Sequence, residues 1–355
     1  MSYSAEQKAL LAADSQSEDE EISDSFDSFS SRQQTYSYRA HVSRVRFKRK
    51  CQFLRNFIFV YCILFCGNFA VDRYNDSMKA SEASECSDVM ADCDSVPFNE
   101  TLVPPYYDYL QMFTVTPRYD ISLCLIPKVM STIGTAAFCY LSDPEAFVCA
   151  DRTISTEHYK QRFCKENDIQ SVKFTNRLLT ENAENIIIVR DPVDRFISGF
   201  TEKCVNSIKS NYCHDCGTDM ICFLQKEYRR LKRISMLFPV YSMADTHFAP
   251  QTWYCDMKNI LRRSTLIKYS NSGRGRTRMI DDFLNVFRRK KVPEKDIDEV
   301  RKELSKGRSH HSTAGSDTRR KYEKLIRENS AIRRAIVRLY YYDFVIFGFD
   351  IPTFQ

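Results

Sequence analysis

Apolar and polar positions along the last two thirds of the chain predict strands separated by helices. Asn185–Val189 is an almost unbroken run of β-branched residues, which is typical of a strand buried on both faces. Ile121–Ile126 and Thr265–Lys268 favour two further strands, and Ser131–Leu141 favours the helix after the first. Other helical periodicities cover Asp194–Val205, Met220–Ile234, Arg278–Arg289, Glu294–Lys306 and Asp317–Tyr342. This alternation predicts an α/β domain whose central parallel sheet is flanked by helices.

The start of the chain lacks such a pattern. Residues 1–40 carry eight acidic and three basic residues and have almost no aliphatic content after Leu11. Such a segment cannot bury enough apolar surface to offset the entropy of ordering it. We therefore expect residues 1–52 to be a disordered tail, whether or not that tail has a role of its own.

Residues 53–71 are apolar and predict a membrane span. About 19 residues at a rise of 1.5 Å each cover roughly 27–30 Å, the thickness of a thin bilayer core. Residues 39–55 carry seven basic residues and no acidic one, which predicts a cytoplasmic tail before the span. This is the pattern of a single-pass type II signal anchor. A buried core helix is the alternative, because the unbroken apolar run, Phe57–Cys66, is shorter than the whole stretch.

Two features favour a lumen for the rest of the chain. Sequons for N-glycosylation begin at Asn75 and Asn99, within residues 72–115, whose Ser, Asp, Glu and Pro content predicts a stem. The folded domain is then expected at 116–355. The chain has 14 cysteines, a number that suits an oxidising compartment.

The cysteines predict disulfides more than a metal site. Cys213-His-Asp-Cys216 has the spacing of half a zinc site but no matching second pair. Three cysteines lie in or beside the expected span, and the eleven that remain are an odd number. One is therefore expected to be free or intermolecular, and Cys124, inside a predicted strand, suits a buried free thiol. The pairing itself does not follow from the sequence.

Two segments carry candidate chemistry for binding phosphate. Pro127-Lys-Val-Met-Ser-Thr132 lies between a predicted strand and a helix, where unpaired backbone N–H groups, hydroxyls and a lysine can hold an anion. The alternative is an ordinary helix with a serine cap. Arg190-Asp-Pro-Val-Asp-Arg-Phe-Ile-Ser198 follows the buried strand, at the edge where α/β sheets bind ligands. Here the alternative makes Asp191 a helix cap and Arg195 its salt-bridge partner.

These segments, in this order and about 60 residues apart, resemble the Golgi carbohydrate sulfotransferases. Pro127–Thr132 looks like their 5′-phosphosulfate loop, and Arg190–Ser198 looks like their 3′-phosphate-binding segment. Thr246–Cys255 and His310–Ser316 are similar to two later segments, the second of which closes over the nucleotide. The likeness covers roughly residues 115–350 and is closest to the chondroitin 4-O-sulfotransferase type, in a nematode-like branch. It implies a P-loop-like sulfotransferase fold for the catalytic domain.

The resemblance also implies a donor and contacts. The donor would be 3′-phosphoadenosine 5′-phosphosulfate (PAPS), with no metal required. Lys128 would stabilise the leaving phosphate, and Arg190 with Ser198 would hold the 3′-phosphate. The implied nucleotide contacts are Pro127, Lys128, Ser131, Thr132, Arg190, Ser198, His311 and Ser312.

His247 is the candidate general base, because the other luminal histidines lack a comparable motif; His311 is the rival. The sequence also departs from the family at two positions. Met130 stands where most relatives have glycine, although the nematode-like branch shares this feature. Phe248 stands where a tryptophan usually follows the histidine.

The implied acceptor is a glycosaminoglycan-like glycan, with the 4-hydroxyl of N-acetylgalactosamine in chondroitin as first candidate, and the implied location is the Golgi membrane. Residues 258–291 carry eleven Lys or Arg against two Asp, which suits a polyanionic glycan or simply a solvated helix face. Nucleic acid is not expected as a partner, because a luminal domain does not meet it.

Three alternatives remain at this point. The first is an inactive relative that binds PAPS or glycan without turnover. The second is a P-loop kinase, disfavoured because the Walker Lys-Ser/Thr signature is absent. The third is a membrane-tethered adhesion protein.

Overall fold

The computed structural model describes residues 102–157, 161–169, 171–206, 210–236, 242–271, 273–306 and 316–353. Within these ranges no helix is both long enough and apolar enough to cross a membrane. The expected tail, the expected anchor at 53–71 and most of the expected stem lie outside them. So do His311 and Ser312, two of the expected nucleotide contacts.

A five-stranded sheet in the order β3-β1-β2-β4-β5 forms the centre of the fold. Its strands are β1 (Phe113–Thr116), β2 (Ile121–Cys124), β3 (Asp168–Ile169), β4 (Glu184–Val189) and β5 (Ser264–Lys268). β4 pairs in parallel with both β2 and β5, which confirms the predicted parallel arrangement for these three strands. β1 pairs antiparallel with β2 and β3, so the sheet as a whole is mixed and not purely parallel.

The sequence interpretation identified neither β1 nor the short β3. A tight turn closes the β1–β2 hairpin, in which the Tyr119 amide donates to the Thr116 carbonyl over 3.1 Å. The residues before β1 also pack on the domain: the indole of Trp253 donates to the Pro104 carbonyl over 2.7 Å. The expected limit between stem and catalytic domain, at residues 115 and 116, falls inside β1.

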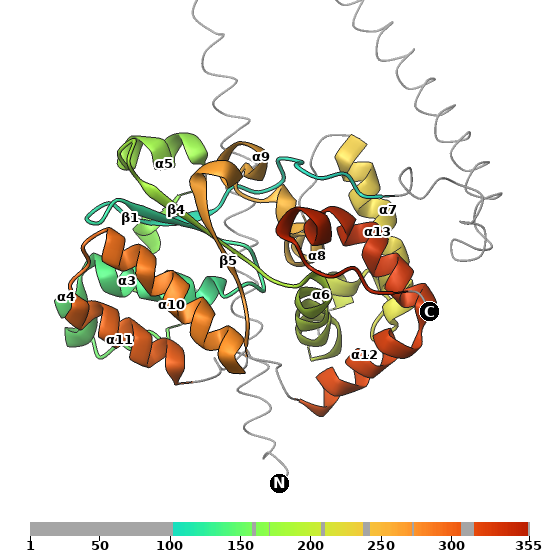
Figure 1. Ribbon diagram of the computed structural model, residues 1–355. Coiled ribbons are helices and arrows are strands. Elements are labelled where there is room, and N and C mark those ends of the chain that lie inside the picture. The colour runs from blue at the N-terminus through green and yellow to red at the C-terminus, as the bar shows by residue number, and fades with distance from the viewer. Residues whose placement is uncertain are drawn as a thin grey trace, which may run out of the picture. The chain divides into compact units, whose positions relative to one another are not determined.

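Helices lie beside the sheet in two groups (Figure 1). α3 (Ser131–Ser142), α10 (Gly273–Arg289) and α11 (Glu294–Ser305) lie together on one side with the short α4 (Pro144–Cys149). Gly134 of α3 allows this approach, because a Cβ there would lie 2.7 Å from the Leu123 side chain on β2.

The second group contains α6 (Pro192–Phe200), α7 (Met220–Met236), α8 (Met243–Phe248), α12 (Asp317–Glu328) and α13 (Ser330–Phe347). A π-helical turn, Thr201–Val205, continues α6. The remaining short elements are α5 (Val172–Leu178), α9 (Met257–Ile260) and 3₁₀ turns at Lys165–Asn167, Ser210–Cys213, Gln251–Trp253 and Leu261–Arg263. In this group the rings of Phe196, Phe200, Phe223 and Phe248 pack against one another in a fully buried cluster.

The last predicted helix, Asp317–Tyr342, is two helices. Asn329 ends α12 and caps α13, because its side chain accepts hydrogen bonds from the amides of Ala331 and Ile332. Asparagine competes with the helical backbone in this way and is favoured at N-caps.

Eight of the described cysteines form four disulfides: Cys124–Cys255, Cys139–Cys164, Cys204–Cys213 and Cys216–Cys222. The expected free thiol at Cys124 is therefore wrong. The segment after the Gln251–Trp253 turn passes β2, which brings the Cα atoms of Cys124 and Cys255 to 6.0 Å. The preference for disulfides over zinc at Cys213 and Cys216 is confirmed, and the free described cysteine is the exposed Cys149.

The Cys124–Cys255 disulfide joins positions 131 residues apart, the longest separation among the four. Removing it as a Cys124→Ala/Cys255→Ala double variant is expected to cost about 2–5 kcal/mol, because the unfolded chain regains the freedom that the cross-link removes. Thermal unfolding of the two proteins measures this, and a non-reducing peptide map checks the pairing. A map with Cys124 as a free thiol would contradict the structure.

Candidate functional site

The loop between β2 and α3 has the geometry of an anion site. Lys128 and Met130 both adopt left-handed backbone conformations, with φ of 66° and 60°. Ser131 then begins α3, and no side chain caps this end of the helix. The first-turn N–H groups, beside the partly exposed hydroxyls of Ser131 and Thr132, are available to a ligand.

The side chain of Lys128 is held beside the loop by an acid from the end of α6. Its Nζ lies 2.5 Å from Oε2 of Glu202, in the π-helical turn. The positive charges of Lys128 and Lys203, with a smaller contribution from His247, outweigh desolvation and lower the pKa of Glu202 to about 2. Glu202 is therefore ionised at any physiological pH. The predicted pair Lys128 and His247 thus lie around one carboxylate that the sequence interpretation did not single out.

Arg190 connects the second predicted segment to the first. It follows β4, and its Nη1 donates to the Lys128 carbonyl over 2.8 Å. Its Nε donates to Asp194 over 2.5 Å, and its guanidinium lies 4.6 Å from the ring centroid of Tyr269. Tyr269 is positioned because its amide extends the β4–β5 pairing, donating to the Val189 carbonyl. The structure therefore places Arg190 and the Lys128 loop in direct contact.

α6 presents the rest of this segment. Asp191 caps the helix by accepting the Asp194 amide over 2.8 Å, as one of the two interpretations of the sequence expected. Ser198 lies two turns along α6 and is 9% exposed. Gly199 beside it is required for packing, because a Cβ there would lie 2.9 Å from the ring of Phe248.

Arg195 links two segments of the backbone by hydrogen bonds. Its Nε donates to the Pro127 carbonyl over 3.0 Å, and its Nη1 donates to the Ala249 carbonyl over 2.8 Å. The side chain is almost fully buried and lies over the ring of Tyr254. The expected salt bridge to Asp191 is replaced by these carbonyl contacts, so Arg195 holds the Lys128 loop to the segment after His247.

Gln251 and Asp343 fix the backbone at Arg190. The Gln251 amide side chain both accepts from the Arg190 N–H and donates to the Arg190 carbonyl, at 2.9 and 2.8 Å. Asp343, on α13, accepts the amides of Gln251 and Thr252. Burial raises the pKa of Asp343, although both hydrogen bonds oppose that shift. The third predicted segment is therefore a support for the phosphate segments.

Comparison with known proteins identifies the family. The model of the sulfotransferase family matches residues 111–350. Carbohydrate sulfotransferase chst-1 of Caenorhabditis elegans is 31% identical over 263 residues, which cover 71% of this chain and 79% of the relative. A second protein of that organism, vep-2, provisionally named as a sulfotransferase, is 36% identical over 237 residues, or 62% of this chain and 71% of the relative. No solved structure matches. This chain belongs to the sulfotransferase family.

This sulfotransferase has Met130 at the position where most relatives have glycine, and the structure shows which backbone conformation the methionine adopts there. Met130 occupies the N-cap of α3 with φ 60° and ψ 16°, a conformation that glycine adopts without a steric cost. Phe248, the other departure, is fully buried against Gly199 and accepts a hydrogen bond at its carbonyl from Tyr340. Phe248 is thus a core residue.

Substitutions at Met130 should separate backbone strain from side-chain contacts. Met130→Gly is expected to unfold at the same temperature as the wild type or slightly above it, because a left-handed conformation costs an ordinary residue about 1–2 kcal/mol. Part of that gain is lost to the greater freedom of glycine in the unfolded chain. Met130→Val, which is β-branched, should instead destabilise the protein. Differential scanning calorimetry measures both, and a Met130→Gly variant less stable than Met130→Val would contradict the backbone assignment.

Arg319 is a further site candidate that sequence reasoning missed. It lies on α12, directly after the expected nucleotide loop, and forms an ion pair with Asp194, the acid that also contacts Arg190. Its Nε donates to Glu323 over 2.7 Å, whereas its Nη1 is buried and has no hydrogen-bond partner among the described residues. The only sequence signal was its place three residues after Ser316.

Proposed function

We propose that this sulfotransferase transfers the sulfuryl group of PAPS to a hydroxyl of a glycosaminoglycan-like acceptor. The single observation that supports this proposal is the hydrogen bond from Arg190 to the Lys128 carbonyl, which joins the two candidate phosphate-binding elements. A donor with phosphates at both its 5′ and 3′ positions needs two such elements side by side.

The first element fits the 5′-phosphosulfate group. The uncapped N-terminus of α3 and the hydroxyls of Ser131 and Thr132 offer hydrogen-bond donors, and Pro127 fixes the entry to the loop. Lys128 would stabilise the charge that develops on the bridging oxygen as the S–O bond breaks. In the structure the Lys128 ammonium faces Glu202, so it would turn from this carboxylate toward a bound ligand.

The second element fits the 3′-phosphate. Arg190 and Ser198 lie at the β4 edge and on α6, and Arg319 adds a buried N–H group without a described partner. Because Asp194 pairs with both guanidinium groups, it keeps Arg190 and Arg319 at one place despite their like charges. His311 and Ser312 remain expected contacts outside the described residues.

In the proposed reaction, the acceptor oxygen attacks sulfur as the bond to the phosphate oxygen breaks, and the acceptor proton passes to a base. His247 is our candidate for this base. It is 6% exposed and lies close enough to Glu202, the partner of Lys128, to interact with it electrostatically. The ionised Glu202 would stabilise the imidazolium that forms. In-line placement and charge stabilisation supply most of the rate in such a transfer.

The acceptor and the location are proposed on separate grounds. chst-1 is named as a carbohydrate sulfotransferase, which favours a sugar hydroxyl here. The start of α10 exposes Arg274 and Arg278 a few residues after Tyr269, which suits a polyanionic chain such as chondroitin. The 4-hydroxyl is our first candidate from the family resemblance alone. The disulfides support a luminal domain, and we propose a type II anchor in the Golgi membrane.

The test is sulfuryl transfer by the purified full-length protein from labelled PAPS to desulfated chondroitin. Lys128→Ala and Arg190→Ala are compared with Lys324→Ala, which removes an exposed lysine on α12. Activity that both site variants lose and the control retains supports the proposal. Thermal stabilisation by PAPS with no product from any of several glycans would favour an inactive binding protein. Phosphate transfer from ATP with Mg²⁺ would favour a kinase, and neither stabilisation nor transfer would overturn the proposal.

A further inference from the structure

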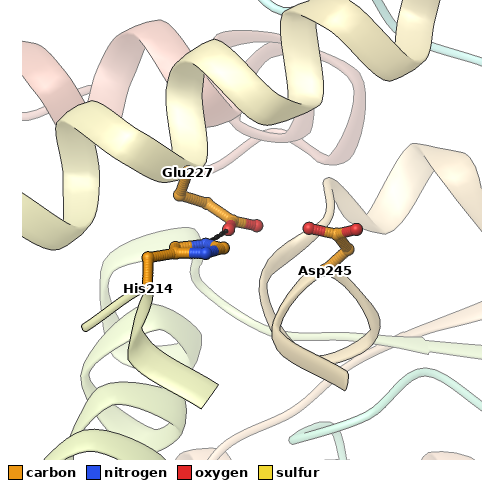
Figure 2. A group of neighbouring side chains, drawn as sticks. All are labelled: His214, Glu227 and Asp245. Atoms are coloured by element: carbon orange, nitrogen blue, oxygen red, sulfur yellow. Dashed lines mark hydrogen bonds and ion pairs between the residues drawn. The ribbon is translucent and has the colours of Figure 1, made fainter. Parts of the chain in front are cut away.

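Three side chains of the types that ligate metals meet where the 213–216 segment, α7 and α8 pack together. They are His214, Glu227 and Asp245, and one potential ligand atom from each lies within 4.8 Å of the others. Figure 2 shows the carboxylates of Glu227 and Asp245 facing one another, with the His214 ring alongside. The three come from the 213–216 segment, α7 and α8, which are successive parts of the chain that the fold packs together.

The cluster is built into rigid surroundings. His214 stands between Cys213, paired with Cys204, and Cys216, paired with Cys222. Its ring stacks on Phe223 with centroids 5.5 Å apart. Glu227 and Asp245 are both fully buried. The ligand atoms are therefore held by two disulfides, a helix and a ring contact, with little freedom to disperse.

The hydrogen bonds leave one buried oxygen of this cluster unsatisfied. Oε2 of Glu227 is 2.6 Å from Nε2 of His214, and both oxygens of Asp245 accept from Nε of Arg230, at 2.6 and 2.7 Å. Oε1 of Glu227 is buried and has no hydrogen-bond partner among the described residues, and it points toward Asp245 in Figure 2. A buried carboxylate oxygen without a partner is costly, and an adjacent carboxylate increases the cost.

The electrostatics of the cluster agree with this geometry. Two fully buried carboxylates lie close together here, and the Arg230 guanidinium contacts that of Asp245. A cation between Glu227 and Asp245 would remove their mutual repulsion and satisfy the orphaned oxygen in one step.

We propose that His214, Glu227 and Asp245 bind one Zn²⁺ ion that supports the fold. One imidazole nitrogen and two carboxylate oxygens are a ligand set that zinc accepts, with water as the fourth ligand. Calcium and magnesium prefer six or more oxygen ligands, which this site does not provide. Arg230 can remain on Asp245, because each carboxylate oxygen has two lone pairs. Any proton held between His214 and Glu227 leaves to solvent when the metal binds.

Such an ion would connect the site to its scaffold. Asp245 lies two residues before His247 on α8, and Cys213 is joined to Cys204 in the π-helical turn that contains Glu202. A metal at the cluster would therefore fix α7, α8 and this turn relative to one another. Its role is positional: the ion does not contact the groups proposed for sulfuryl transfer, and the proposal stands whether or not the acceptor is a glycan.

The experiment uses the full-length protein with a histidine-free tag. The protein is dialysed against a chelator, and Zn²⁺ alone is then added while metal content and thermal unfolding are followed. We expect one zinc per chain and a rise in melting temperature of about 5 °C or more at saturating zinc. Mn²⁺ and Ca²⁺ at the same concentration should raise it less.

Glu227→Gln is the decisive variant because it keeps the size and the contact to His214 but removes a charge. In the absence of metal it should melt no lower than the wild type, since its repulsion with Asp245 is gone, and zinc should no longer raise its melting temperature. The matched control is Glu294→Gln, which changes an exposed carboxylate on α11 and should respond to zinc like the wild type.

Two outcomes would overturn the proposal. One is a wild type that neither retains zinc after gel filtration nor gains stability from it. The other is a zinc response that Glu227→Gln retains in full, which would assign the metal to residues elsewhere in the chain. A wild-type melting temperature that depends on pH but not on zinc would also overturn the proposal. The cluster would then consist of two ion pairs, His214 with Glu227 and Arg230 with Asp245.

Discussion

Replacing Lys128 with alanine is expected to lower the kcat for sulfuryl transfer by on the order of 10²–10³-fold, the usual effect of removing a group that stabilises transition-state charge. The structure makes this expectation specific. The Lys128 loop is held in place from the outside, by Arg190 at the Lys128 carbonyl and Arg195 at the Pro127 carbonyl, so loss of the side chain leaves the backbone positioned. PAPS should therefore still bind, and the loss should fall mainly on kcat.

Glu202 complicates the interpretation of this variant, and a second substitution resolves it. Without Lys128, the carboxylate loses the main cause of its low pKa. A carboxyl whose pKa is lowered by folding stabilises the protein above its unfolded value of 4.5, and this stability is lost as pH falls toward the folded value of about 2. The stability difference between wild type and Lys128→Ala should thus be full at neutral pH and shrink below pH 4.5. Lys128→Ala/Glu202→Gln should recover stability but not activity.

Calorimetry across pH 2–7, beside steady-state kinetics with varied PAPS, measures both effects. Arg327→Ala is the control, because it removes a positive charge from an exposed position on α12. If Lys128→Ala turned over at the wild-type rate, Lys128 would have no place in the chemistry. If the double variant regained activity, the single-variant loss would come from the unpaired Glu202.

The sequence was most informative where one local pattern decides the structure. The β-branched run of β4 has no stable alternative to a buried strand, and the helix after Lys128 begins at Ser131 as predicted. Each candidate phosphate segment also follows a strand, as predicted, because its place depends only on that strand and the turn after it. β1 was harder, since four residues beside a proline-rich region do not distinguish a strand from a stem.

What the sequence could not supply were contacts across long separations. In the sequence Glu202 is an ordinary acid inside the predicted helix Asp194–Val205, and only the structure shows that it pairs with Lys128. Cys124 reads as a lone core thiol until the chain returns with Cys255. Arg319 has no local motif at all. In each case a residue acquires its role from a partner more than 70 residues away, and no periodicity encodes that distance.

Arg195→Met is expected to be the most destabilising of the single substitutions considered, at about 3–5 kcal/mol, because it breaks a buried network around a charge. Methionine fills much of the same volume but donates no hydrogen bond, so the carbonyls of Pro127 and Ala249 are left unpaired in the interior. Each unsatisfied carbonyl costs about 1–3 kcal/mol. Loss of attraction to Arg195 should also raise the already elevated pKa of Asp343 further.

This loss should appear as a fall in melting temperature of about 6–20 °C, since 1 kcal/mol shifts a domain of this size by roughly 2–4 °C. Arg195→Lys should retain part of the stability, because the lysine ammonium keeps the charge and can donate to one of the two carbonyls. It lacks the planar guanidinium that lets arginine donate to both. Arg327→Met, on the exposed face of α12, is the control and should melt with the wild type. If Arg195→Met melted at the wild-type temperature, other contacts would hold the Pro127 and Ala249 segments together. Arg195 would then not be what joins the Lys128 loop to the segment after His247.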